Sequence, residues 1–238
     1  MRRLLTAATL AVSLVAFAEF TPTSGGVDYG LIDETDGEQT ATVYLVNTGT
    51  EADQIIRVRT TCGCTVAAYD ENLIEPGDTT WVEVTYNPRG RIGRFEKAVK
   101  ITDSFKQTLT IPITGLIKAS QETVESMYPV QVGPLALSTD KIMMADLRMD
   151  ESKHAFIEVY NNSDRTVSPL FESKSSAVEV VGKAKDIEPA NFETYGFYVK
   201  TREADSTGPN EFTIDLYPTG DKEEPPFEIK IYVNIEGY

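Results

Sequence analysis

One pattern of alternating apolar residues occurs twice along the chain. In the first half, Val43-x-Leu45-x-Asn47 is followed by Ile74-Glu75-Pro76. In the second half, Ile157-x-Val159-x-Asn161 is followed at nearly the same spacing by Ile187-Glu188-Pro189. A chain of 238 residues with such a repeat predicts two similar domains, each large enough to bury a modest core.

The residues after each Ile-Glu-Pro alternate in the same way. The apolar triplets expected to face inward are Val82, Val84 and Tyr86 in the first copy and Tyr195, Phe197 and Val199 in the second. Strict period-2 alternation over short runs, bounded by turn residues, indicates antiparallel strands. About seven strands per copy predict an all-β protein made of two tandem immunoglobulin-like β-sandwich domains. We expect the domains at residues 25–118 and 130–238, with a polar linker at 119–129, and no stretch shows a sustained helical period.

The N-terminus predicts export. Arg2 and Arg3 precede an apolar run at residues 4–17, and Ala16-Phe17-Ala18 is a small-x-small cleavage site. This pattern is typical of a secretory signal peptide, here residues 1–18, cleaved near Ala18. No later apolar run is long enough to span a bilayer. We therefore expect a secreted protein, periplasmic or extracellular, in an oxidising compartment.

The charge of the chain limits its partners. The formal net charge is −15, so the protein repels nucleic acid and anionic lipid. We expect no nucleic acid and no membrane insertion, and we expect a protein or glycan partner at the cell envelope.

Both cysteines lie in one short segment, Cys62-Gly63-Cys64. They share the parity of Ile56, Val58 and Thr60, so a continuous strand would direct all five side chains to one face. Three interpretations stay open: a strained disulfide, a two-thiolate metal clip, or two small buried apolar side chains. The second copy has Ser176 and Val178 at the matching positions, so the fold does not need thiols. We predict a structural thiol pair.

The first copy resembles a family of secreted bacterial domains of unknown function, numbered 1573 and common in Bacteroidetes-type bacteria. The family is similar to the immunoglobulin-like domains of the ASPM/SPD-2/Hydin type. The resemblance implies a secreted β-sandwich and no known activity; the second copy shares only the sandwich pattern. The matching segments are Asp28-Tyr29-Gly30-x-Ile32, Val43-x-Leu45-x-Asn47-Thr48-Gly49, Cys62-Gly63-Cys64-Thr65, Ile74-x-Pro76-Gly77, Val82-x-Val84-x-Tyr86 and Gly90-Arg91-x-Gly93-x-Phe95.

The sequence offers little for catalysis. His154 is the single histidine and belongs to the second copy, whereas both cysteines belong to the first, so no Cys-His pair with an orienting third group is indicated. Two cysteines without a local histidine fall short of a zinc site. We therefore predict no catalytic residue, no metal site and no cofactor. Thiol exchange or binding of monovalent copper by Cys62 and Cys64 is the alternative.

Two features are candidates for partner binding. Trp81 has the parity opposite to the inward set of its strand, which places it on the outer face, where a lone tryptophan is often an interface residue. It could equally cap the sandwich edge. Arg89, Arg91 and Arg94 surround a Gly-rich turn, where they could hold an anionic partner or pair with nearby acids. The resulting prediction is a non-enzymatic binding or structural module, with a two-domain periplasmic chaperone as a third function.

Overall fold

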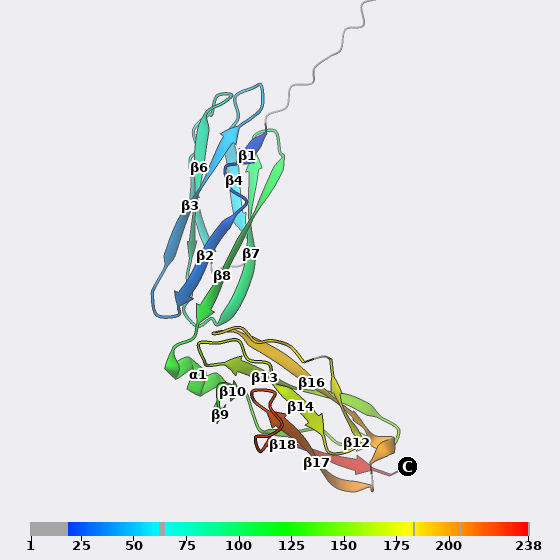
Figure 1. Ribbon diagram of the computed structural model, residues 1–238. Coiled ribbons are helices and arrows are strands. Elements are labelled where there is room, and N and C mark those ends of the chain that lie inside the picture. The colour runs from blue at the N-terminus through cyan, green and yellow to red at the C-terminus, as the bar shows by residue number, and fades with distance from the viewer. Residues whose placement is uncertain (1–18, 62–64, 183, 205, 238) are drawn as a thin grey trace, which may run out of the picture. The chain divides into compact units, whose positions relative to one another are not determined.

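The structure is a computed structural model that describes residues 19–61, 65–182, 184–204 and 206–237 (Figure 1). Its strands form four sheets, two in each of two β-sandwiches. This arrangement confirms the predicted all-β fold with two tandem immunoglobulin-like sandwiches. No helix in these described ranges is long and apolar enough to cross a membrane.

The first sandwich packs two four-stranded sheets, of order β1-β3-β6-β5 and β2-β8-β7-β4. Val82, Val84 and Tyr86 are buried, as their alternation predicts. The strands are β1 (Phe20–Pro22), β2 (Val27–Asp33), β3 (Gln39–Asn47), β4 (Ile55–Thr60), β5 (Thr65–Tyr69), β6 (Thr79–Tyr86), β7 (Gly93–Asp103) and β8 (Thr108–Lys118).

The second sandwich packs five-stranded sheets of order β15-β16-β13-β10-β9 and β11-β18-β17-β14, and β12 pairs with β18. Its predicted inward triplet, Tyr195, Phe197 and Val199, is buried in the core. The elements are β9 (Val130–Val132), β10 (Leu135–Leu137), β11 (Lys141–Met143), β12 (Leu147–Arg148), β13 (Ser152–Asn161), β14 (Leu170–Ser173), β15 (Val178–Val181), β16 (Phe192–Lys200), the 3-10 helix η1 (Thr201–Glu203), β17 (Gly208–Tyr217) and β18 (Phe227–Glu236).

Each copy of the repeat contains one fully buried asparagine with the same contacts. Asn47 Nδ2 donates to the carbonyl oxygens of Glu51 (2.8 Å) and Ile74 (2.9 Å). Asn161 Nδ2 donates to those of Arg165 (2.7 Å) and Ile187 (2.8 Å). In both copies the asparagine ends the strand that begins the repeat and fixes the chain before the Ile-Glu-Pro segment. The sequence repeat is therefore also a repeat of buried hydrogen bonds.

The predicted linker contains a helix that the sequence analysis missed, α1 (Gln121–Met127). Ser120 caps it, because its hydroxyl accepts from the Thr123 N–H at 3.2 Å. Val124 and Tyr128 are four residues apart and both buried, and the ring of Tyr128 stacks on that of Tyr160 at 5.4 Å. Two apolar positions are too few for a recognisable helical period, so the pattern alone could not predict this helix.

Strand β4 departs from the predicted parity. Its register against β7 shifts between Ile55 and Arg57, which inserts a β-bulge. Ile55 is consequently buried and Ile56 is 49% exposed. The expectation that Ile56 shares one face of the strand with Val58 and Thr60 is therefore wrong. The predicted thiol pair, Cys62 and Cys64, lies outside the described residues.

By its internal contacts the chain divides into two compact units. The first consists of residues up to Asp28 with Thr40–Tyr86 and Glu96–Ile113, and the second of Tyr29–Gln39, Asn87–Phe95 and Thr114–Tyr238. The faces of β3, β4, β6 and β7 considered below belong to the first unit.

Candidate functional site

Trp81 lies on the outer face of sheet β1-β3-β6-β5. Its side chain is 37% exposed, whereas Val82 and Val84 beside it are fully buried. The structure therefore confirms the outward direction predicted from parity. The strand registers explain it, because successive side chains of a strand alternate between core and solvent.

A second aromatic side chain, which the sequence analysis missed, lies across from Trp81. The hydroxyls of Thr40 in β3 and Thr85 in β6 are 3.0 Å apart, which opposes these two residues on neighbouring strands. Continuing the same antiparallel register along both strands opposes Tyr44 and Trp81. Tyr44 is 53% exposed. We call Trp81 and Tyr44 the aromatic pair.

The three arginines of the turn after β6 have separate surroundings. Arg89 and Arg91 are exposed, and the Asn87 side chain accepts from the Arg89 N–H at 3.0 Å. Arg94 Nη2 lies 2.5 Å from Glu188 Oε2 within the second compact unit. Trp81 is near the start of β6 and the turn follows its end, so the structure does not join these predicted residues into one site.

A row of three cations lies on the outer face of the other sheet. Arg59 of β4 and Lys100 of β7 are direct cross-strand partners, and Arg57 is two residues along β4 from Arg59. All three are exposed. None of the ion pairs within the described ranges includes them. Strand β8, on the other side of β7, has no acidic residue. We call Arg57, Arg59 and Lys100 the cationic row.

The equivalent position in the second sandwich also holds a like-charge pair, of opposite sign. Lys100 and Asp215 occupy the same position counted from the glycines at which β7 and β17 begin. The cross-strand partner of Asp215 is Glu172 of β14. Two carboxylates thus stand where the first sandwich has Arg59 and Lys100.

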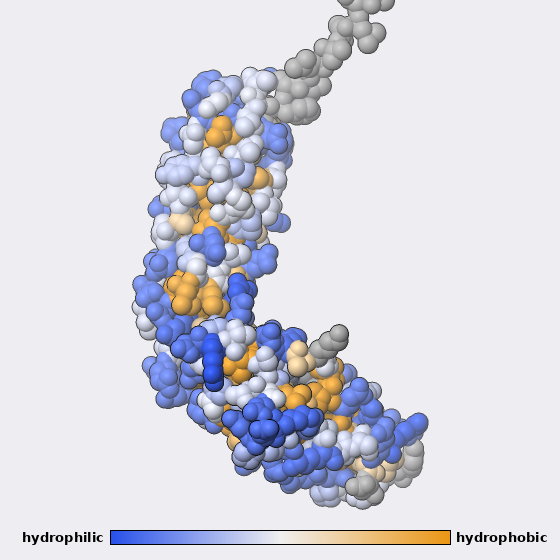
Figure 2. All heavy atoms as spheres, viewed as in Figure 1, coloured by the Kyte–Doolittle hydropathy of each residue, from blue (hydrophilic) through white to orange (hydrophobic). Residues whose placement is uncertain are grey.

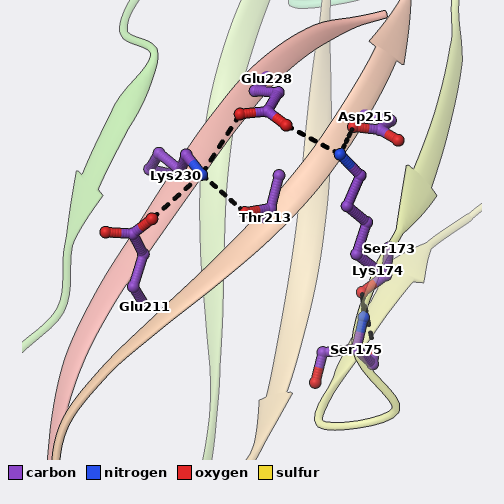
Figure 3. A network of polar contacts seen from close by, with 8 residues as sticks. All are labelled: Ser173, Lys174, Ser175, Glu211, Thr213, Asp215, Glu228 and Lys230. Carbon is purple, nitrogen blue, oxygen red and sulfur yellow. Dashed lines mark hydrogen bonds and ion pairs between the residues drawn. The ribbon is translucent and has the colours of Figure 1, made fainter.

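Lysines neutralise this acidic pair. Lys174 Nζ lies 2.9 Å from Asp215 Oδ1, and Lys222 forms an ion pair with Glu172. Lys174 also bonds Glu228 at 2.8 Å, and these hydrogen bonds raise the pKa of Lys174. Figure 3 shows how the network continues from Glu228 to Lys230, which also contacts Glu211 and Thr213.

One buried carboxylate has a structural role. Asp53 is fully buried, and its Oδ1 accepts from the Ser104 hydroxyl at 2.6 Å and from the Ser104 N–H at 3.2 Å. Burial raises the pKa of the neighbouring Asp103, and the charge of Asp53 adds to that effect. Across the described ranges, no three His, Cys, Asp or Glu side chains gather in a way that could hold a metal ion.

The other sequence predictions concern histidine and the thiols. His154 is exposed on β13, and its ring lies 4.6 Å from that of Tyr198. Thiol exchange or copper binding by Cys62 and Cys64 stays a prediction.

Comparison with known proteins places the first sandwich in a family. Residues 20–117 match the model described as "Protein of unknown function (DUF1573)". The first sandwich is a DUF1573 domain. The family has no assigned activity, and no curated protein matches the chain.

Solved structures resemble the chain at low identity. A protein of unknown function from Porphyromonas gingivalis W83 is 12% identical, with 90% of this chain and 99% of that chain covered and a TM-score of 0.38. The PapD-like domain 7 of human CEP192 is 10% identical, with 46% and 92% covered and a TM-score of 0.36. An endo-fucoidan hydrolase of glycoside hydrolase family 107 is 11% identical, with 92% of this chain but 29% of that chain covered and a TM-score of 0.38.

Proposed function

We propose that this protein is an exported, non-enzymatic binding module of the bacterial cell envelope, and that the aromatic pair contacts its protein or glycan partner. The observation that carries the proposal is the exposure of Trp81 and Tyr44 side by side on a sheet face. Aromatic rings are rigid, lose little conformational entropy on binding and combine an apolar surface with a polar tip.

The surroundings of the aromatic pair favour binding over catalysis. Thr40 and Thr42 are exposed along β3, and their short side chains leave the rings accessible. Figure 2 shows that hydrophobic side chains reach the surface in separate small patches on the face in view. A pair of large rings on a flat, mostly polar face suits a partner that lies across the strands.

Site-specific photo-crosslinking in the intact bacterium tests the proposal. A photoreactive side chain is placed at position 81 or 44, and at Lys153 of the second sandwich as a control, where the side chain is also exposed. We expect one discrete crosslinked species from positions 81 and 44 and none from position 153. Equal crosslinking at all three positions would contradict the site.

A second measurement tests the location. Fractionation should recover the protein outside the cytoplasm, and intact mass should show cleavage after Ala18. Recovery of the full-length chain in the cytoplasm would contradict export.

Replacing both Trp81 and Tyr44 with Ala should abolish the crosslink from a third, neighbouring position, Thr42, without changing the far-UV circular dichroism spectrum.

A further inference from the structure

We propose that the free edge of β4 binds an acidic, extended segment of a partner protein, whose carboxylates supply the counter-charges that the cationic row lacks. This binding site lies on a different sheet from the aromatic pair. It therefore does not depend on the function proposed for that pair.

The positive charge of the cationic row is not neutralised by any ion pair in the described ranges. Side chains directly opposite on antiparallel strands have Cβ atoms ~4.5–5.5 Å apart, so Arg59 and Lys100 repel each other. The chain has a net charge of −15, so carboxylates are abundant, yet none of those in the described ranges pairs with these two cations. At the equivalent position of the second sandwich, Lys174 and Lys222 neutralise the like-charge pair. The second sandwich thus contains its own counter-ions at this position, whereas the first sandwich shows none in the described ranges.

Within the described ranges, β4 is the last strand of its sheet. The edge of a sheet is the position at which an extended segment of another chain can be added as a further strand. Alternate side chains of a strand are ~6.7 Å apart on one face. Carboxylates at alternate positions of an added segment would therefore stand beside Arg57 and Arg59. The residues between them would face half-buried Val58, which favours apolar side chains there.

Protection of the edge against aggregation explains only part of the row. Cations on an edge strand discourage uncontrolled strand pairing, which accounts for Arg57 and Arg59. Lys100 lies on β7, one strand inside the edge, where it gives no such protection. A ligand whose carboxylates lie near both β4 and β7 would explain why Lys100 stands directly opposite Arg59.

The test is fluorescence anisotropy of a labelled peptide of alternating Glu and Val residues, titrated with the full chain at low salt. We expect saturable binding that weakens as salt rises. A block peptide of the same composition, with all Glu residues first, should bind at least about tenfold more weakly, or ~1.4 kcal/mol, because its charges do not alternate along one face. Equal binding of the two peptides, or displacement by dextran sulfate without any preference for alternation, would overturn strand addition.

Charge-reversed variants locate the site. R57E/R59E should weaken binding about tenfold or more, and Lys100→Gln several-fold. K153E/R165E changes the net charge by the same amount at two exposed residues of the second sandwich and should bind like the wild type. Equal weakening by both double variants would show a general charge effect and overturn the site. Lys100→Gln keeps the test valid should R57E/R59E fold poorly.

Two peptides methylated on backbone nitrogens test the main-chain bonds. One carries the methyl groups on its Glu residues and the other on its Val residues. An added strand directs only one of these two sets of N–H groups toward β4, so one peptide should lose binding and the other retain it. Retention by both, or loss by both, would contradict strand addition.

Discussion

The two sandwiches place a like-charge pair at the same cross-strand position but surround it differently. In the second sandwich, Asp215 and Glu172 each form an ion pair with a lysine. Figure 3 shows Lys174 between Asp215 and Glu228. In the first, Arg59 and Lys100 have no counter-ion among the described residues. The comparison shows that the second sandwich neutralises its like-charge pair with its own lysines. For the first sandwich we propose that a partner supplies the opposite charges.

The two copies agree where the fold requires it. Asn47 and Asn161 make the same pair of bonds to main-chain carbonyls, and both are fully buried. The cores are therefore built on one plan, whereas the outer faces differ in charge. Stability and binding should accordingly respond to different residues in this molecule.

The largest effect is expected from the buried asparagines. Asn47→Ala removes the Nδ2 donor of two main-chain hydrogen bonds and the Oδ1 that accepts from the Gly49 N–H, so it should lower the free energy of unfolding of the first sandwich by about 2–3 kcal/mol. Asn161→Ala should cost the second sandwich about as much, which tests whether the copies are equivalent. Urea unfolding measures both: the fluorescence of Trp81, the chain's single tryptophan, follows the first sandwich, and far-UV circular dichroism, to which both sandwiches contribute, gives the transition of the second. Asn162→Ala, at an exposed residue, is the control. If either buried asparagine lowered the free energy of unfolding by less than about 1 kcal/mol on replacement, the two copies would not share this structural role.

A smaller effect is expected at the start of α1. Glu34 is buried, and its carboxylate accepts from the N–H groups of Ser120 (2.9 Å) and Gly90 (3.1 Å) and from the Thr123 hydroxyl (2.9 Å). Burial alone favours the protonated form, but these hydrogen bonds outweigh it and lower the pKa of Glu34. Glu34→Gln should cost about 1–2 kcal/mol at neutral pH, because an amide nitrogen cannot accept from these donors.

The stability difference between the wild type and Glu34→Gln should depend on pH in a direction that follows from the lowered pKa of Glu34. A carboxyl whose folded-state pKa is lowered stabilises the fold above its unfolded pKa, about 4.3 for Glu, and loses that contribution as pH falls through the folded value. The stability difference between wild type and Glu34→Gln should therefore shrink below about pH 4. Glu158→Gln is the control at the other end of the helix, where the carboxylate accepts a single 3.3 Å bond from Tyr128. A pH-independent difference would contradict the role of the Glu34 charge.

The smallest effects are expected from the like-charge pairs themselves. Lys100→Glu turns a repulsive cross-strand pair into an attractive one and should stabilise the free protein by about 0.5 kcal/mol. Lys174→Met removes the counter-ion of the buried Asp215 carboxylate and should lower the urea midpoint of the second sandwich slightly. Added salt should reduce the effect of Lys100→Glu, which changes an exposed charge, more than the effect of Lys174→Met. Destabilisation by Lys100→Glu would mean that the cationic pair is already neutralised within the chain.

The sequence predicted what depends on local alternation. The inward sets around Val84 and Phe197 and the outward direction of Trp81 follow from period-2 patterning within single segments. The repeat also aligned Asn47 with Asn161, but their burial and hydrogen bonds came from the structure. Helix α1 was not predicted because only two buried apolar residues, Val124 within it and Tyr128 at its C-terminal cap, mark its apolar side. The β-bulge at Ile56 was not predicted, because a single inserted residue changes which side chains of β4 face the core and leaves no signal in the amino-acid composition.

Both candidate binding surfaces depended on strand pairing. Arg59 and Lys100, like Tyr44 and Trp81, are far apart in sequence, and only the register of neighbouring strands brings them together. Counting along the chain alone gave no reason to place Lys100 beside Arg59. Alignment of Lys100 with Asp215 through the glycines that begin β7 and β17 was the one available signal of a charge difference between the copies.

The most direct test is an NMR titration of the isotope-labelled full chain with the alternating Glu-Val peptide. We predict that shifts of backbone amide signals concentrate on Ile56–Thr60 of β4 and on the part of β7 around Lys100. The equivalent strands β14 and β17 should show none, since their acidic pair is already neutralised. Equal shifts in β14 and β17, or no saturable shift in β4, would contradict the account.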